Sequence, residues 1–234
     1  MNIYGLLIGI TIYIGISQFQ KKDNYIPKAK QNKFIYTLII LSIIGARLYH
    51  VADLWFYYKN NPIEIINLPA GGLGIFGAII LSFIYISIFC YQNRLNLIKV
   101  LNLITPSLAL GQSIGRLGNY FNTEVFGIPT YIDFGQYIPI ESRPPVYLNY
   151  SYFHPIWLYE SILMLIVFLI IRKNKQPLSI YLISYGLIRF FLEFLRFDTW
   201  IQGNIKIAQL ISLIMVTTGF ILNYLQFKNK KCLN

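Results

Sequence analysis

The stretch from Gly115 to Gly127, GRLGNYFNTEVFG, places an arginine, two asparagines and a glutamate among three glycines directly after an apolar run. Its arginine, Arg116, carries planar N–H donors that match phosphate or carboxylate oxygens, and it stays charged at any accessible pH. An arginine at the edge of so apolar a segment marks a functional site by default, because burying it without a partner costs free energy. Two interpretations follow: an anion-binding site, or a helix end whose arginine reaches a lipid phosphate at a membrane surface.

A second set of charges lies inside a later apolar run. Tyr185, Arg189, Glu193 and Arg196 are spaced i, i+4, i+8 and i+11, a pattern that puts all four side chains on one face of a helix. Such a face must look into a helix bundle rather than toward lipid. Arg189 and Glu193 could form an ion pair that only locks helices together, or the arginines could hold an anionic ligand.

The composition indicates that these charges lie in a membrane. Of the 234 residues, 56% are hydrophobic, 17% are aromatic and 12% are charged, and the mean hydropathy is +0.53. A chain of this length and apolarity is predicted to be a polytopic membrane protein rather than a soluble domain. The net charge is +11, but the basic residues lie in short loops between apolar runs, so we expect a membrane-orientation signal and no nucleic-acid partner.

Seven apolar runs are long enough to cross a hydrocarbon core of roughly 30 Å at about 1.5 Å per residue. The predicted fold class is an all-α integral membrane protein with about seven transmembrane helices, forming a single polytopic domain over residues 1–234. The connection at 116–153 is rich in proline and tyrosine and is expected to form a small ordered external cap between helices four and five. The runs cover residues 3–19, 34–57, 73–91, 97–115, 155–171, 178–196 and 206–227.

The loops alternate in charge. The first, third and fifth loops and the C-terminal tail are rich in lysine and arginine, whereas the other loops hold about as many acids as bases. The positive-inside rule therefore predicts that the basic loops and the tail are cytoplasmic and that the N-terminus is outside. Counting along the helices from their cytoplasmic ends then places Arg47, Arg116, Glu160 and the 185–196 charges in the outer part of the membrane. The site is expected to face outward.

A phospholipid suits such a site, with its anionic head at the outer interface and its acyl tails in the bilayer. The acids at this depth cannot neutralise every arginine, so an anionic ligand explains the cluster better than ion pairs alone. Guanidinium groups bind phosphate bidentately. A small transporter would instead need polar groups that continue through the midplane, and the inner halves of these runs are apolar.

Together these motifs resemble the bacterial prolipoprotein diacylglyceryl transferase family over nearly the whole chain. GRLGNYFNTEVFG matches the family's GR-x-GN-x-x-N-x-E-x-x-G at every fixed position. Further matches follow in the same order and spacing: Tyr4-Gly5-Leu6, Gly45-Ala46-Arg47, Gly71-Gly72-Leu73, His154-Pro155 with Leu158-Tyr159-Glu160, Tyr185 to Arg196, and Gln209 with Ser212.

The resemblance implies an enzyme of the bacterial cytoplasmic membrane that moves the diacylglyceryl group of phosphatidylglycerol to the lipobox cysteine of a prolipoprotein signal peptide. It forms a thioether, releases glycerol 1-phosphate and implies no metal or cofactor. Preorganised cations stabilise the departing phosphate, so Arg116 and Arg189 are assigned as catalytic, with His154 as the candidate base for the thiol. The other candidates would bind the head group or orient the arginines: Tyr4, Arg47, Asn119, Glu124, Gly127, Glu160, Tyr185, Glu193 and Arg196.

Three positions depart from the family pattern. Phe76 stands where a histidine, often considered a catalytic base, would be, Asn102 replaces an aspartate, and Trp157 replaces a glutamine. A diverged, non-catalytic protein that binds anionic phospholipid or lipoprotein precursor is therefore the alternative. We expect an active enzyme, because a thiol with an ordinary pKa of about 8.5 needs little more than a nearby pair of guanidinium groups to become thiolate.

Overall fold

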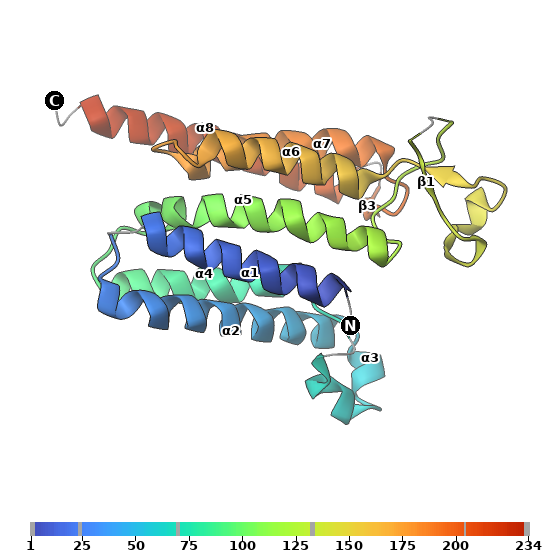
Figure 1. Ribbon diagram of the computed structural model, residues 1–234, viewed down its shortest axis with the longest axis horizontal. Helices are drawn as coiled ribbons and strands as arrows, with labels where there is room; N and C mark the ends of the chain where they lie inside the picture. Colours follow the sequence, from blue (N-terminus) through green and yellow to red (C-terminus); the bar gives the residue numbers. More distant parts are fainter. Residues whose placement is uncertain (1–2, 23–24, 69–70, 132–133, 204, 232–234) are drawn as a thin grey trace. The chain divides into compact units, whose positions relative to one another are not determined.

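In the computed structural model, residues 3–22, 25–68, 71–131, 134–203 and 205–231 are described. Each predicted apolar run overlaps a long helix, although 34–57 and 178–196 extend beyond the ends of theirs, and the described chain is mostly helical (Figure 1). The helices are α1 (Ile3–Lys22), α2 (Lys28–Asp53), α4 (Ile75–Gln92), α5 (Leu97–Phe121), α6 (Ile156–Ile171), α7 (Pro177–Leu192) and α8 (Ile207–Lys231).

Five of these helices are long and apolar enough to cross a membrane. They are α2, α4, α5, α8 and α7 extended to Leu195. The apolar helix α6 has 16 residues, a rise of about 24 Å. The chain is thus a mostly helical, multi-pass membrane protein, and the prediction of seven spans additionally requires α1 and α6 to cross.

The chain forms two compact units, residues 1–21 with 102–234 and residues 22–101. In the second unit α2 and α4 run antiparallel, since Phe34 stacks near Tyr85 and Phe89 at one end and Gly45 meets Gly77 toward the other. A Cβ on either glycine would collide with the carbonyl oxygen of the other. The two backbones therefore approach as closely as small residues allow, the usual basis of helix association in lipid.

The connection from α2 to α4 is built on short helical turns, α3 (Trp55–Tyr58) and η1 (Pro62–Ile66). Gly71 and Gly72 follow with φ of 86° and 74°, a left-handed conformation that glycine adopts without penalty. A Cβ on Gly72 would also lie 2.5 Å from His50 Nε2. Gly71 and Gly72, which belong to one of the family motifs, therefore allow the chain to turn tightly and pack closely against α2.

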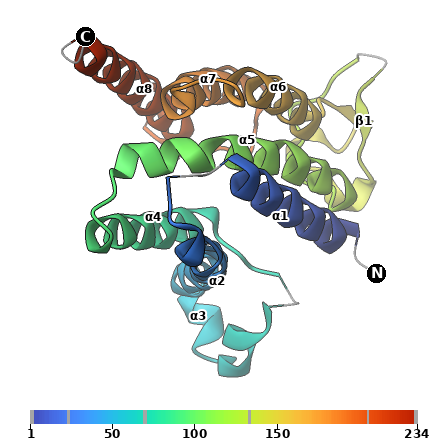
Figure 2. The ribbon, with the colours of Figure 1, turned by 60° about the vertical axis from the view of Figure 1, so that its left-hand side comes forward.

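In the first unit, α6 and α7 lie next to α5 (Figures 1 and 2). Ser113 Oγ donates to the Ser161 carbonyl at 2.9 Å, and Ser161 Oγ donates to the Ser113 carbonyl at 2.8 Å. This reciprocal pair joins α5 to α6 in a region where each such bond contributes about 0.6–2 kcal/mol. The buried core beneath it consists of Ala109, Leu110, Met164, Val167, Phe168, Ile171 and Tyr181. Helix α8 packs on α7 through Gly186 and Gly219.

The segment predicted as a cap starts later than expected, because α5 runs through Arg116 to Phe121 instead of ending at residue 115. Strands β1 (Gln136–Tyr137) and β2 (Tyr152–Phe153) then pair antiparallel, with the turns η3 (Ile140–Ser142) and η4 (Pro145–Tyr147) between them. A small aromatic core holds this segment together: Phe126, Ile138 and Phe153, with Tyr147 and Phe197 against them.

The predicted single helical face from Tyr185 to Arg196 is wrong at its C-terminal end. Helix α7 ends at Leu192, the turn η5 (Glu193–Leu195) follows, and Arg196 is extended at φ −94° and ψ 137°. Strands β3 (Ile201–Gln202) and β4 (Ile205–Lys206) form a hairpin that returns the chain to α8. Lys206 Nζ donates to the carbonyls of Glu193 at 2.7 Å and Arg196 at 3.3 Å. A cation at carbonyls just beyond the C-terminus of α7 is favourable to that helix end.

Candidate active site

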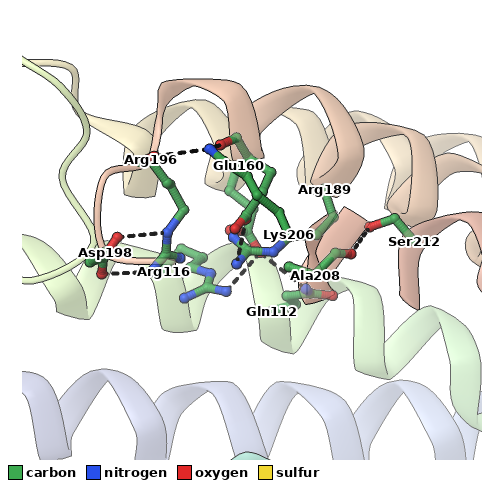
Figure 3. A network of polar contacts seen from close by, with 10 residues as sticks. Gln112, Arg116, Glu160, Arg189, Arg196, Asp198, Lys206, Ala208 and Ser212 are labelled. Carbon is green, nitrogen blue, oxygen red and sulfur yellow. Dashed lines mark hydrogen bonds and ion pairs between the residues drawn. The ribbon is translucent and has the colours of Figure 1, made fainter. Parts of the chain in front are cut away.

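The first unit brings Arg116 of α5 against Glu160 of α6. Arg116 Nη2 lies 2.8 Å from Glu160 Oε1, and the glutamate side chain is fully buried (Figure 3). Gln112, one turn before Arg116, donates from Nε2 to the same oxygen at 3.2 Å. Tyr181 of α7 donates its hydroxyl to Gln112 Oε1 at 2.8 Å, and Arg116 also hydrogen-bonds Tyr185. Three helices thus hold one guanidinium in a set orientation.

A second arginine–glutamate pair lies at the end of α7. Arg189 Nη2 is 2.9 Å from Glu193 Oε2, and the Glu193 side chain is 1% exposed. The i,i+4 pair considered from sequence is therefore present. Its arginine is not satisfied by that pair, since Arg189 Nη1 is buried without a hydrogen-bond partner among the described residues. A charged donor left in this state favours binding of an acceptor such as a phosphate oxygen.

The signature stretch supplies two further side chains beside Arg116. Asn119 is buried and donates from Nδ2 to Glu124 Oε2 at 3.2 Å, while its Oδ1 lies 3.5 Å from Arg116 Nη1. Glu124 sits between Thr123 and Val125, whose φ values are 55° and 57°. A left-handed backbone is unfavourable for a β-branched residue and costs about 1–3 kcal/mol. The turn after α5 is therefore made by these strained residues.

Gly127 lies against protein backbone. A Cβ there would lie 2.6 Å from the Leu195 carbonyl oxygen and 3.0 Å from Ile156. The Gly127 N–H donates to the His154 carbonyl at 2.8 Å. The close approach that this glycine permits is made by the chain itself, which joins the cap segment to the start of α6 and to η5.

Arg196 pairs with a third acid. It forms a bidentate pair with Asp198, with Nε 3.0 Å from Oδ1 and Nη2 2.7 Å from Oδ2. Asp198 is 44% exposed. Arg116, Arg189 and Arg196 therefore each pair with a separate acid, contrary to the argument that acids could not neutralise them. Arg189 Nη1, which has no hydrogen-bond partner among the described residues, is what remains to favour an anion.

Arg47 belongs to the second unit, where all five of its N–H donors reach backbone carbonyls. Nε donates to Ile65, Nη1 to Gly71 and Gly72, and Nη2 to Glu64 and Asn67. Its guanidinium also lies 5.2 Å from the ring centre of Tyr58. A direct role for Arg47 in substrate binding stays a prediction, and the observed contacts make it the residue that holds the α2–α4 connection. The side chain of Tyr4 lies outside the described residues.

His154 lies just before α6, where its Nδ1 is 3.1 Å from the Tyr159 hydroxyl. Partial burial lowers the pKa of His154 below its ordinary value of 6.5, so the imidazole is neutral near pH 7 and able to accept a proton. Its described contacts do not join it to the Arg116–Glu160 network. Its assignment as the base therefore stays a prediction.

The three departures from the family pattern have local explanations. Asn102 Oδ1 accepts the Leu178 N–H at 2.9 Å, so an amide oxygen caps the first turn of α7 as a carboxylate could. Trp157 donates from Nε1 to Gln136 Oε1 at 2.6 Å and thereby ties α6 to β1. Phe76, in the second unit, packs near Tyr49 with ring centres 5.8 Å apart.

Gln112, Tyr181 and Lys206 were missed by sequence reasoning. Gln112 lies four residues before Arg116, and Tyr181 lies four before Tyr185, so each shares a helix face with a predicted residue. That spacing was a usable signal. Lys206 had none, because its contact with Glu193 depends on the β3–β4 hairpin.

Comparisons with known proteins decide the family of this chain. A sequence model of the prolipoprotein diacylglyceryl transferase family matches residues 1–225. The chain belongs to this family. A phosphatidylglycerol–prolipoprotein diacylglyceryl transferase of Thermosynechococcus vestitus is 38% identical over 227 residues, covering 92% of this chain and 85% of the relative. Proteins of the same name from Prochlorococcus marinus strain MIT 9301 and Synechococcus sp. strain CC9902 are 38% and 36% identical, covering 93% and 92% of this chain and 86% and 85% of the relatives.

Membership of this family favours a transferase over the non-catalytic alternative. The arrangement suits transfer chemistry: two guanidinium groups, each oriented by a buried carboxylate, present N–H donors that need not reorganise as charge develops.

Proposed function

We propose that this protein transfers the diacylglyceryl group of phosphatidylglycerol to the lipobox cysteine of prolipoproteins. The cysteine sulfur attacks C3 of the diacylated glycerol, a C–S bond forms, and the C–O bond to phosphate breaks. Glycerol 1-phosphate leaves with the bonding electrons, and the thiol proton passes to a base or to solvent. The observation that carries the proposal is the buried Nη1 of Arg189, which has no hydrogen-bond partner in the described part of the chain although Nη2 pairs with Glu193, in a chain of this family.

In this reaction the chain has two tasks. Arg116 and Arg189 stabilise the negative charge that grows on the departing phosphate, an effect worth several kcal/mol in a site that excludes water. Glu160, Glu193, Asn119 and Tyr185 keep the guanidinium groups in position through the contacts described above. The thiol must also become thiolate, which two nearby guanidinium groups favour electrostatically, with His154 as an assisting base.

The direct test uses purified protein, phosphatidylglycerol and a lipobox peptide, with release of glycerol phosphate as the readout. We expect the wild type to be active and Phe76→His to add little, because the arginine field supplies most of the thiol activation. An inactive wild type that Phe76→His activates would show that the base was lost at Phe76. Complementation of a strain depleted of its own diacylglyceryl transferase tests the same function in cells.

The pH dependence of kcat/KM tests His154. Because burial lowers its pKa below 6.5, the folded protein keeps the histidine neutral, and protonation occurs only as the pH falls below that value. We expect an acid limb centred below pH 6.5 that disappears in His154→Ala, with a rate loss of no more than about 100-fold. An acid limb unchanged in His154→Ala would assign the titration to another group.

For the arrangement in the membrane, we propose seven spans in the bacterial cytoplasmic membrane with the N-terminus and the cap segment outside and the C-terminus inside. The lysine- and arginine-rich alternate loops support this orientation. A C-terminal alkaline phosphatase fusion is expected to be inactive and a C-terminal fluorescent-protein fusion bright. An active phosphatase fusion would place the arginines on the wrong side for prolipoproteins that have crossed the membrane.

A further inference from the structure

The two oxygens of the Glu160 carboxylate have unequal surroundings. Oε1 accepts from both Arg116 and Gln112, at 2.8 Å and 3.2 Å. Oε2 is buried and has no hydrogen-bond partner among the described residues. The side chain as a whole is fully buried in the first unit, so among the described residues this oxygen lacks both a donor and contact with solvent.

The donors on Oε1 are held there by their neighbours. Tyr181 donates to Gln112 Oε1 at 2.8 Å, which leaves the amide NH2 of Gln112 facing Glu160. Arg116 is restrained by Asn119 and Tyr185 in addition to the carboxylate. Both donors are directed at Oε1, and none of the described residues donates to Oε2, so a bound molecule is a suitable source of a donor for that oxygen.

A buried carboxylate oxygen without a donor is costly, and a ligand that supplies one regains the lost hydrogen bond. A phosphate group is unsuitable, since its oxygens accept and its charge is repelled by the carboxylate. A hydroxyl group is suitable. In phosphatidylglycerol the two hydroxyls of the head-group glycerol lie a few bonds from the phosphate that Arg116 and Arg189 are proposed to bind.

We propose that Glu160 is a specificity-determining residue that accepts a hydrogen bond from a head-group hydroxyl and so selects phospholipids whose head group is a polyol. Gln112 and Tyr181 are positioning residues that keep Oε2 available. This inference rests on the proposed function for its substrate, but the two can fail separately. Turnover of phosphatidylglycerol tests the function, and the ratio between two lipids tests Glu160.

The experiment compares phosphatidylglycerol with phosphatidylpropanol, which has the same phosphate and acyl chains but no hydroxyl, using one lipobox peptide. For the wild type, loss of the hydroxyls is expected to lower kcat/KM roughly 10- to 100-fold, the usual effect of one hydrogen bond to a charged group. Glu160→Gln is expected to be slower on phosphatidylglycerol and to discriminate much less between the lipids. Equal turnover of both lipids by the wild type, or unchanged discrimination in Glu160→Gln, would overturn the proposal.

Glu193→Gln is the matched control, because it makes the same change in the other buried carboxylate and is expected to slow both lipids equally. Should Glu160→Gln fail to fold, as judged by thermal unfolding in detergent, Tyr181→Phe takes its place. Removing that hydroxyl frees Gln112 to turn toward Oε2, so discrimination between the two lipids is expected to fall while the fold is kept.

The affinities of the two lipids, measured by native mass spectrometry, extend the comparison to variants that are too slow to assay. The proposal would be contradicted if Tyr181→Phe kept the wild-type ratio of kcat/KM between the two lipids and the two lipids bound with equal affinity.

Discussion

Arg116→Lys is expected to lower kcat/KM for diacylglyceryl transfer at least about 100-fold, although the positive charge is kept. The guanidinium contacts Glu160 through Nη2 and Asn119 through Nη1, and it also contacts Tyr185. A lysine ammonium is compact and cannot keep those contacts while also making a bidentate contact to phosphate. The loss should appear in kcat as well as in KM, because the interaction strengthens as the phosphate departs.

Arg143→Lys is the control for this measurement. Arg143 also uses two nitrogens of its guanidinium group, since Nε donates to the Ile138 carbonyl at 2.8 Å and Nη1 to the Leu148 carbonyl at 3.0 Å. These contacts lie within the cap segment. We expect that variant to keep activity within a few-fold of wild type. Near wild-type turnover by Arg116→Lys, with glycerol phosphate release as the readout, would remove Arg116 from the proposed phosphate site.

Gly77→Ala is expected to destabilise the second unit by about 3 kcal/mol, the upper part of the range for overpacking. The new methyl group would meet the Gly45 carbonyl oxygen, which is backbone and cannot turn aside as a side chain could, and it would also meet Cβ of Tyr49. Helices α2 and α4 would have to separate, and contacts along their whole interface would loosen. The same reasoning applies to Gly45→Ala.

The measurement is thermal or denaturant unfolding in detergent, with Gly9→Ala as the control. Gly9 is likewise inside a helix, but a Cβ there has nothing within 4 Å among the described atoms. Its substitution is expected to be neutral or to stabilise the helix by up to about 1 kcal/mol. Equal stability of Gly77→Ala and Gly9→Ala would show that the α2–α4 contact is looser than the structure has it.

The helices follow from the sequence alone because apolar runs of this length have one stable arrangement in lipid, in which every backbone N–H and C=O is paired within the helix. Each predicted run overlaps a long helix for that reason. The ends were less predictable. Helix α5 continues past Gly115, and α7 stops at Leu192, just before the carbonyls of Glu193 and Arg196 that Lys206 of the β3–β4 hairpin binds.

Sequence spacing identified the arginines and acids of the site, since charges in apolar helices are rare and need partners. Sequence spacing could not identify which acid forms an ion pair with which arginine. Arg116 pairs with Glu160, 44 positions away, because α5 and α6 are joined at Ser113 and Ser161. Arg196, assigned to the same helical face, pairs with Asp198 once the helix has ended.

The chain's membrane class, its helices and the chemical types at its site are therefore properties of the sequence, because they depend on residue type and on spacing within single helices. The roles of Arg47, Gly127 and Gln112 were decided by tertiary structure. Arg47 meets five carbonyls of a loop, and Gly127 meets the Leu195 carbonyl. Gln112 meets a tyrosine of another helix. Such contacts form between segments whose approach is set by packing, and no local pattern encodes the direction in which a hydrogen bond will point.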